Sequence, residues 1–334
     1  MTWDRRIGVI DMYIEDVEGT RAFYEQAFGL PVQRHPDGLV YFTFGETIMH
    51  LRNVDSAAEF VAPAQVATSK DGARGVFTIF TEGVDAACSE LTDRGVALLN
   101  GPADRRWGIR NACFADPSGQ IWEIAGSPTS AGTKDKSAAT GARAWERTEK
   151  RIGNIVLFAE DWRRAKAFYQ TGLGVPVAGE YDDGASFHFG DTTVSVLDFP
   201  GARELIEPAQ VGGTTAGLRF TFCMFVDDLD AACAELAERG VKPRADPWEF
   251  GPGPSDCQLC RPCRSHMGNG CRRHQGGFLT GQPRAGLATG RANLCPPRQF
   301  PGAVWAYTAR QVLAPGDHRS WARTPEDFRR ETRG

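Results

Sequence analysis

The stretch SDCQLCRPCRSHMGNGC at residues 255–271 carries the side chains with the most obvious capacity for chemistry. His266 lies within it and His274 just beyond it, and four cysteines stand at short spacings. Zinc favours thiolate and imidazole ligands, and pairs of cysteines separated by two other residues are typical of its sites. The first hypothesis is therefore a zinc or iron–sulfur centre. Its sulfur ligands would be Cys257, Cys260, Cys263 and Cys271.

The surrounding sequence argues against such a centre. No helix or strand pattern flanks the cysteines, and a metal site needs ordered elements to position its ligands. Residues 255–334 contain thirteen Arg, no Lys and five acidic residues, which gives a formal net charge of +8, whereas the rest of the chain carries −12. A basic segment attracts nucleic acid, but this one lacks the interleaved aromatic residues of single-strand binders. We expect neither a metal nor a nucleic-acid partner here.

The remaining composition is that of a globular protein. The chain has 334 residues, 41% of them hydrophobic and 24% charged, which is enough for two domains with their own cores. No apolar run approaches the roughly 20 residues that a membrane span requires. The N-terminal residues also lack the basic and apolar regions of a signal peptide. These features predict a cytoplasmic protein with no membrane partner.

One internal repeat runs through the chain at a constant offset of 145 residues. The tripeptide AFY at residues 22–24 recurs at 167–169, and VDAACSELTDRGV at 84–96 recurs as LDAACAELAERGV at 229–241. Because no gap is needed to align the copies, the chain is a tandem duplication. Small polar residues without an apolar period separate the copies, and they predict a linker at residues 127–150.

Each copy shows the same succession of patterns. Residues 7–14 have the character of a strand, and residues 15–29 have an apolar helix face that ends at Gly29. Two short strands around a turn follow, and the order then repeats up to a hairpin turn at residues 116–119. Each copy is thus predicted to hold two β-α-β-β-β units. The fold class is α+β with four tandem units.

These patterns resemble the vicinal oxygen chelate superfamily, which includes glyoxalase I, bleomycin-resistance proteins and extradiol dioxygenases. The resemblance rests on the AFY…GLPV start, the DAAC.EL..RGV helix and the FADPSGQIWEIAG end, and it covers residues 7–126 and 152 to about 251. It implies that the units pair into cup-shaped mixed sheets that hold a small ligand or a metal. We therefore assign a first domain to residues 1–126 and a second to residues 151–254.

The second copy stops matching the first at residue 255. The segment RNACFADPSGQIWEIA of the first copy should recur there, where SDCQLCRPCRSHMGNG stands instead. If the observed residues are back-translated and read one base later, the codons of Met267 and Gly268 force a Trp opposite Trp122. The neighbouring codons allow RTANFADPAGHIWEMA, which is identical to the first copy at eleven of sixteen positions. We hypothesise a single-base insertion or deletion, or a sequencing error, just before Ser255.

This frameshift hypothesis has two structural consequences. Residues 255–334 would be an out-of-frame, disordered tail that is not homologous to the first copy. The second domain would lack its final strands, and the open sheet edge would be available for self-association.

The resemblance also implies where a metal would bind. Metal-dependent members place ligands on the first, fourth, fifth and eighth strands of a pair of units. In the first copy these positions fall on Val9, His50, Val76 and Glu123. In the second copy they fall on Asn154, Ser195, Thr221 and Gly268. A divalent metal needs about three or more protein ligands, and valine cannot coordinate. We therefore expect no cofactor, with His50 and Glu123 as the remaining metal candidates.

Two functions stay open. The first is a metal-free cup that binds a small, partly aromatic molecule, and the acidic body of the chain would suit a cationic ligand. The second is a metal-dependent lyase, isomerase or dioxygenase of the glyoxalase type, so that enzyme activity is undecided. Bound metal that is lost on Glu123→Ala would distinguish them.

In both cases we expect the cup of the first domain to contact the ligand through four side chains. His50 and Glu123 could also serve as a general base and its partner. The alternative for each is an ordinary polar or aromatic position on the protein surface. The four are His50, Glu123, Asp11 and Trp107.

Overall fold

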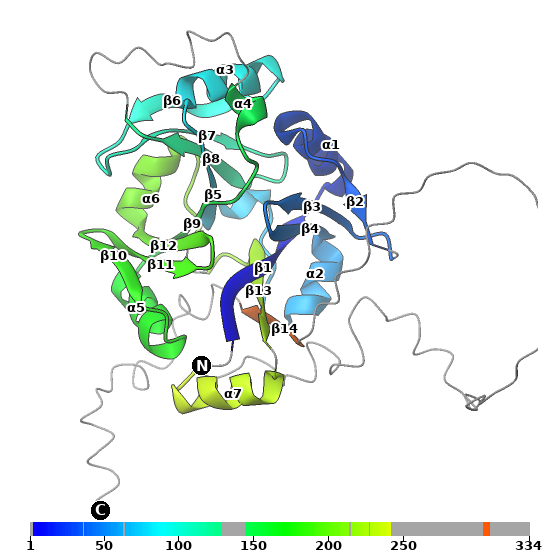
Figure 1. Ribbon diagram of the computed structural model, residues 1–334. Helices are drawn as coiled ribbons and strands as arrows, with labels where there is room; N and C mark the ends of the chain where they lie inside the picture. Colours follow the sequence, from blue (N-terminus) through cyan, green and yellow to red (C-terminus); the bar gives the residue numbers. More distant parts are fainter. Residues whose placement is uncertain are drawn as a thin grey trace, which may run out of the picture.

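The computed structural model describes residues 3–35, 37–62, 64–128, 144–213, 215–226, 228–241 and 303–307. It confirms the α+β class and the tandem arrangement of β-α-β-β-β units (Figure 1). The first unit comprises β1 (Trp3–Ile14), α1 (Val17–Phe28), β2 (Gln33–Arg34), β3 (Val40–Phe44) and β4 (Thr47–Asn53). The second comprises β5 (Gly75–Phe80), α3 (Val84–Asp93), β6 (Leu98–Asp104), β7 (Arg110–Ala115) and β8 (Ile121–Gly126).

The second copy repeats this order as far as the described residues extend. Its first unit comprises β9 (Asn154–Ala159), α5 (Trp162–Ala167), β10 (Val177–Tyr181), β11 (Gly184–Phe189) and β12 (Thr192–Asp198). Its second unit is described as β13 (Phe220–Val226) and α7 (Leu229–Glu238). Two helices that the sequence patterns did not indicate, α2 (Val54–Val61) and α6 (Phe199–Ile206), follow the first unit of each copy.

Local sequence explains where the first helix begins and ends. The side chain of Asp16 accepts a hydrogen bond from the Gly19 amide at 2.9 Å, which caps the N-terminus of α1. Gly29 closes the helix with a φ of 68°, a left-handed conformation that glycine adopts without a Cβ clash. Between these caps Tyr24, Ala27 and Phe28 are buried at helical spacing. The predicted helix and its end at Gly29 are thus confirmed. Its buried face differs from the predicted one, because Phe28 is buried as expected but Ala22 is exposed.

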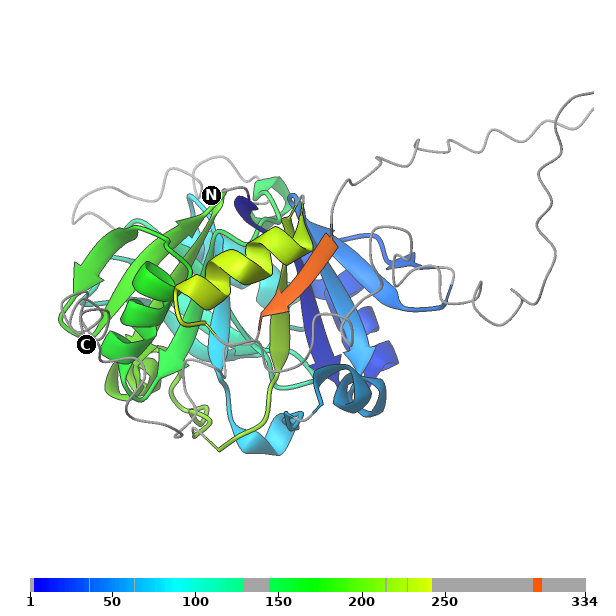
Figure 2. The ribbon, with the colours of Figure 1, turned by 90° about the horizontal axis from the view of Figure 1, so that it is seen from below.

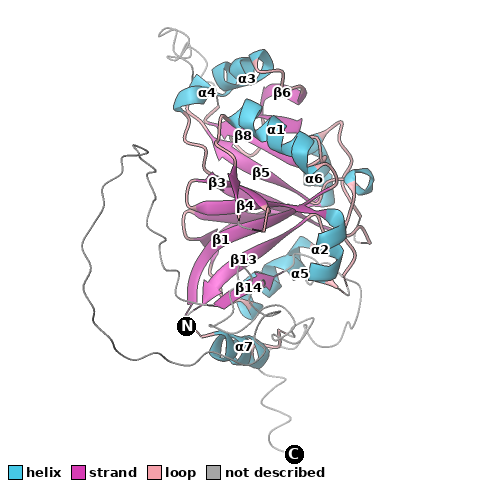
Figure 3. Ribbon diagram, turned by 90° about the vertical axis from the view of Figure 1, so that its right-hand side faces the viewer, coloured by secondary structure: helices cyan, strands magenta, loops and turns pink. Residues whose placement is uncertain are grey.

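Each of the two mixed sheets takes strands from both copies. The first sheet has the order β14-β13-β1-β4-β3-β2, and the second has the order β10-β11-β12-β9-β5-β8-β7-β6. β13 of the second copy lies beside β1 and pairs antiparallel with it (Figure 3). β9 pairs antiparallel with β5. The expectation that the first copy forms a cup by itself is therefore wrong. Apolar periodicity indicates that a segment is a strand, but it carries no information about which strand will be its partner.

The contacts between the copies are reciprocal. Val66 bridges to Leu218, and Ala73 bridges to Val211; at the repeat offset of 145, Leu218 is the counterpart of Ala73, and Val211 that of Val66. The main sheets obey the same rule, since Val9 lies opposite Cys223, the counterpart of Thr78, while Thr78 lies opposite Asn154, the counterpart of Val9. Such reciprocity defines a two-fold interface. The chain is thus built like a symmetric dimer joined by a linker.

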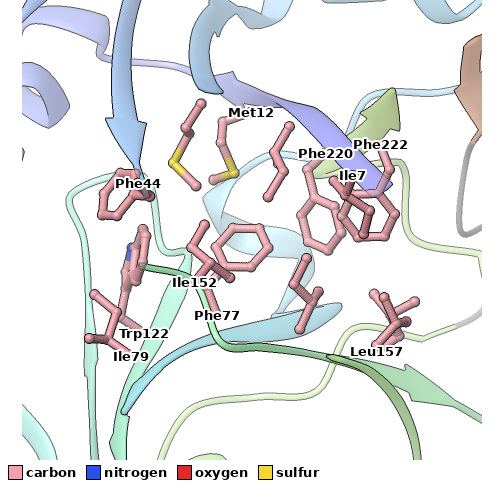
Figure 4. Packing of buried hydrophobic residues seen from close by; sticks show 14 of the residues in the cluster. Ile7, Met12, Phe44, Phe77, Ile79, Trp122, Ile152, Leu157, Phe220 and Phe222 are labelled. Carbon is pink, nitrogen blue, oxygen red and sulfur yellow. The ribbon is translucent and has the colours of Figure 1, made fainter. Parts of the chain in front are cut away.

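One apolar core lies between the two sheets. It takes Ile10 and Met12 from the first sheet, Phe77 and Leu157 from the second, and further side chains from α1, α3 and α5. Figure 4 shows Met12, Phe77 and Leu157 in this core. The Phe77 and Phe220 rings meet across it, with centroids 5.1 Å apart. Each sheet therefore has an inner face on this core and an outer face on the opposite side. None of the described helices is long and apolar enough to cross a membrane.

Two boundaries differ from those expected. The predicted linker at residues 127–150 contains α4 (Ala144–Arg147), whose Trp145 is buried and donates from Nε1 to the Ala27 carbonyl at 2.7 Å. Most of the predicted tail, including the four cysteines, lies outside the described residues. Within it β14 (Ala303–Tyr307) pairs antiparallel with β13, so this strand covers the sheet edge that was expected to be open (Figure 2).

Candidate functional site

The outer face of the first sheet carries a cluster of polar side chains on neighbouring strands. Along β1, Ile10 and Met12 belong to the shared core, so Asp11 between them points to the outer face. His50 lies between two core residues of β4 in the same way, and its Cα pairs with that of Asp11. We call the following five residues the Asp11 cluster: Asp11, His35, Tyr41, His50 and Arg52.

A buried carboxylate organises this cluster. Asp11 Oδ1 accepts hydrogen bonds from His50 Nδ1 at 3.0 Å and from Arg52 Nη2 at 3.1 Å. The Cys223 thiol lies 3.5 Å from Oδ2. Burial raises the pKa of Asp11, but the hydrogen bonds and charges of His50 and Arg52 outweigh it and hold this pKa below its ordinary value. Asp11 therefore stays ionised inside the sheet.

Two imidazoles extend the cluster toward solvent. Nε2 of His35 lies 3.1 Å from Nε2 of His50, and the His35 ring stacks on Tyr41 with centroids 4.4 Å apart. Because the carboxylate of Asp11 accepts from Nδ1–H of His50, the neutral His50 presents a lone pair at Nε2, and His35 donates to it. Burial, followed by the charge of His50, lowers the pKa of His35.

Glu123 belongs to a different network on the second sheet. Its Oε2 accepts from Thr78 Oγ1 at 2.5 Å, and its Oε1 accepts from Asn111 Nδ2 at 2.5 Å. Arg105 Nε in turn donates to Asn111 Oδ1 at 2.7 Å. Only 2% of Glu123 is exposed, and burial raises its pKa. Since His50 lies on the first sheet with other partners, the structure does not bring the predicted base and partner together.

The raised pKa of Glu123 gives a testable pH dependence. A carboxyl group whose pKa is higher in the folded state binds more protons there, so its contribution to stability falls as pH rises through that pKa. We expect Glu123→Gln, which keeps the shape and the bond from Asn111, to be more stable than the wild type at pH 7. The difference should shrink as the pH is lowered toward the ordinary pKa of glutamate, about 4.3. Thermal unfolding of both proteins across this range checks the prediction, and a gap that widens on acidification would contradict it.

Trp107 also lies beside the second sheet. It lies between β6 and β7 and donates from Nε1 to Asp183 at 3.1 Å. It also packs against a second, smaller apolar cluster, which includes Val76 and Phe158. The guanidinium of Arg106 lies over its ring at 4.6 Å. The four predicted ligand contacts thus divide into two pairs, with Asp11 and His50 on one sheet and Glu123 and Trp107 on the other.

The donor set does not fit the divalent metal that the family resemblance implies. Val9 and Val76 offer no ligand atom, and both oxygens of Glu123 already accept hydrogen bonds. Of the positions carried over in the second copy, Ser195 donates to Asn154 at 3.0 Å. Among the described residues, no group of three or more His, Cys, Asp or Glu side chains could hold a metal ion. Gly268 lies outside the described residues.

Sequence patterns missed three members of the cluster. Arg52 could have been found, since it lies two residues after His50 on a strand and therefore shares its face. Tyr41 could also have been found, since it lies between the core residues Val40 and Phe42 on a strand. His35 could not, because its place depends on the turn that follows β2.

Tandem β-α-β-β-β units that share two mixed sheets define the class of fold. The chain belongs to the Glyoxalase/Bleomycin resistance protein/Dioxygenase superfamily, whose family model matches residues 6–124 and again residues 151–269. Two matches in one chain agree with the tandem repeat. No curated protein matched the chain in sequence.

The fold of the chain is similar to that of solved structures, two of which are described next. Glyoxalase I from Zea mays is 16% identical, with a TM-score of 0.49 over 70% of this chain and 79% of the maize chain. A glyoxalase/bleomycin resistance protein/dioxygenase from Nocardioides is 21% identical, with a TM-score of 0.32 over 38% of this chain and 85% of the other. At these values neither likeness assigns a function.

Proposed function

We propose that the protein binds a small organic molecule on the outer face of its first sheet and needs no protein-bound metal to do so. The Asp11 cluster carries the proposal. Its carboxylate is 4% exposed, whereas the side chains of His50 and Arg52 around it are 14% and 20% exposed. Burying a charged carboxyl group is costly unless it is paired. A polar network of this kind that reaches the surface is therefore a ligand-site candidate.

The network around Glu123 supports this choice of face by contrast. Both carboxylate oxygens of Glu123 are engaged by Thr78 and Asn111, and the side chain is almost fully buried. The three side chains bond to one another and are all buried, so they offer almost no surface to a ligand. Because Thr78 and Asn111 already donate to the carboxylate of Glu123, the structure does not favour a metal-dependent lyase, isomerase or dioxygenase that would use Glu123 as a metal ligand.

A fragment screen by NMR in a buffer with chelator tests the proposal. The panel should contain cationic, anionic and neutral ring compounds. We expect hits to shift the amide signals of β1, β3 and β4, and we expect His50→Gln to weaken their binding by about tenfold, or about 1.4 kcal/mol.

The second sheet offers a matched control. His188 is an exposed histidine on β11, and His188→Gln should leave these affinities within about twofold. Hits that bind only after addition of a divalent metal, or that shift β5 and β8 instead, would contradict the proposed function.

A further inference from the structure

We infer that the ligand of this face is a flat organic anion, with its charged group at Arg52 and its ring against the stack of Tyr41 and His35. This inference rests on the proposed function and adds the chemical class of the ligand. It also reverses the cationic preference that the acidic composition predicted.

Asp11 is not available to a cationic ligand. Its Oδ1 already accepts from His50 Nδ1 and from both Nε and Nη2 of Arg52, at 3.0, 3.3 and 3.1 Å. Its other oxygen faces the Cys223 thiol inside the sheet. A cation approaching from solvent would therefore have to displace an existing partner, and the remaining buried groups would lose their hydrogen bonds.

The groups that do reach solvent are mostly hydrogen-bond donors. They are the guanidinium of Arg52 and the phenol of Tyr41, both partly exposed. The imidazoles of His50 and His35 direct their N–H groups at Asp11 and at each other. Asp37 is an exposed carboxylate on the same hairpin, and its Oδ1 accepts from the Leu39 amide at 3.1 Å. Because Arg52 is more exposed than Asp11, the positive member of the ion pair dominates the field at the surface.

The acidity of the whole chain has little weight at this distance. Exposed charges farther apart than a Debye length, about 8 Å at physiological ionic strength, are largely screened. The pair of Arg52 and Asp11 is neutral overall, and the exposed carboxylate of Asp37 adds one negative charge that acts on His35. Local geometry therefore outweighs composition in selecting the charge of the ligand.

Several ring planes favour a flat ligand. His35 and Tyr41 are nearly parallel, with an interplanar angle of 23°, while His50 stands edge-on to both, at 79° and 82°. The Arg52 guanidinium lies over the Phe60 ring of α2 at 4.8 Å, which holds its plane. A fixed guanidinium plane suits a carboxylate or a similar anion, because both can form two parallel hydrogen bonds.

Calorimetric titration of the full chain with benzoate, benzamidine and benzyl alcohol tests the inference, since the three share a ring and differ in charge. We expect benzoate to bind at least about tenfold more tightly than the other two. Arg52→Gln should weaken benzoate by about tenfold or more. The control Arg34→Gln, an exposed arginine of β2 bonded to Glu18, makes the same change in net charge and should alter it by less than about twofold.

The Asp11→Asn variant gives a further test, because the expected result is a gain of affinity and a loss of structure would lower the affinity. It removes the negative member of the ion pair, so benzoate affinity should rise, by about three- to tenfold. A fall in affinity, with the variant shown by NMR to be folded, would overturn the inference. So would equal losses in the two arginine variants.

The two proposals fail in different ways. Tighter binding of benzamidine, or binding of cationic or neutral fragments alone, would overturn the anionic class and leave the small-molecule function standing. If no member of the wider fragment panel binds the first sheet, the proposed function fails, and this inference fails with it.

Discussion

Replacing residues 255–334 with RTANFADPAGHIWEMA is expected to raise the free energy of unfolding by about 3–5 kcal/mol. The figure is the usual cost of removing a large buried aromatic side chain. In the first copy Trp122 is fully buried, and its ring contacts those of Tyr24, Phe44 and Phe77 at centroid distances of 5.6, 5.1 and 5.4 Å. The restored sequence would place a Trp at the matching position of the second copy.

The second copy already holds most of the residues that would surround this Trp. At the repeat offset the counterparts of Tyr24, Phe44 and Phe77 are Tyr169, Phe189 and Phe222, and all three are buried. The Tyr24 hydroxyl donates to Asp116 at 2.8 Å, and the counterpart of Asp116 is Arg261, outside the described residues. The frameshift hypothesis predicts that the second copy keeps such an aromatic set, which would receive the restored Trp.

Two further chains make the measurement decisive. One ends at residue 254, and the other carries the restored sequence with Ala in place of its Trp. Chemical unfolding should rank the restored chain first, and the Ala version should lose most of the gain. If the Trp and Ala versions unfold at the same denaturant concentration, the aromatic set does not receive a Trp, and the result contradicts the frameshift hypothesis.

The sequence predicted the elements well and their association poorly. The caps at Asp16 and Gly29 and the alternation around Asp11 and His50 are local features, so they can be read from neighbouring residues. The pairing of β1 with β13 depends on residues more than 200 positions apart, and no local pattern encodes it. The same gap explains the site. His50 was found from its family position. The contact of His35 with His50, and the placement of His50 and Glu123 on different sheets, follow only from the folded structure.

Residues 1–150 expressed alone are expected to form a symmetric homodimer. Both β1 and β5 would lose their partners in the second copy, and a monomer would expose two open sheet edges and the inner faces of both half-sheets. The reciprocity of the contacts offers a replacement, because β5 of a second molecule can take the place of β13 while β1 takes that of β9. The fragment keeps Trp145, which packs against Phe28.

The bonds that join the copies can be rebuilt in such a dimer. Arg74 donates to the carbonyls of Gly212 and Gly213, and its counterpart Arg219 donates to that of Thr68. Gly213 is the counterpart of Thr68, so in a homodimer Arg74 of each molecule would find the Thr68 carbonyl of the other. Light scattering after size exclusion should give twice the mass of the fragment. The Arg74→Ala variant should instead give unfolded monomer or aggregates. A stable, folded monomer would show that the first copy completes its own sheets, and it would contradict the shared-sheet basis of the fold.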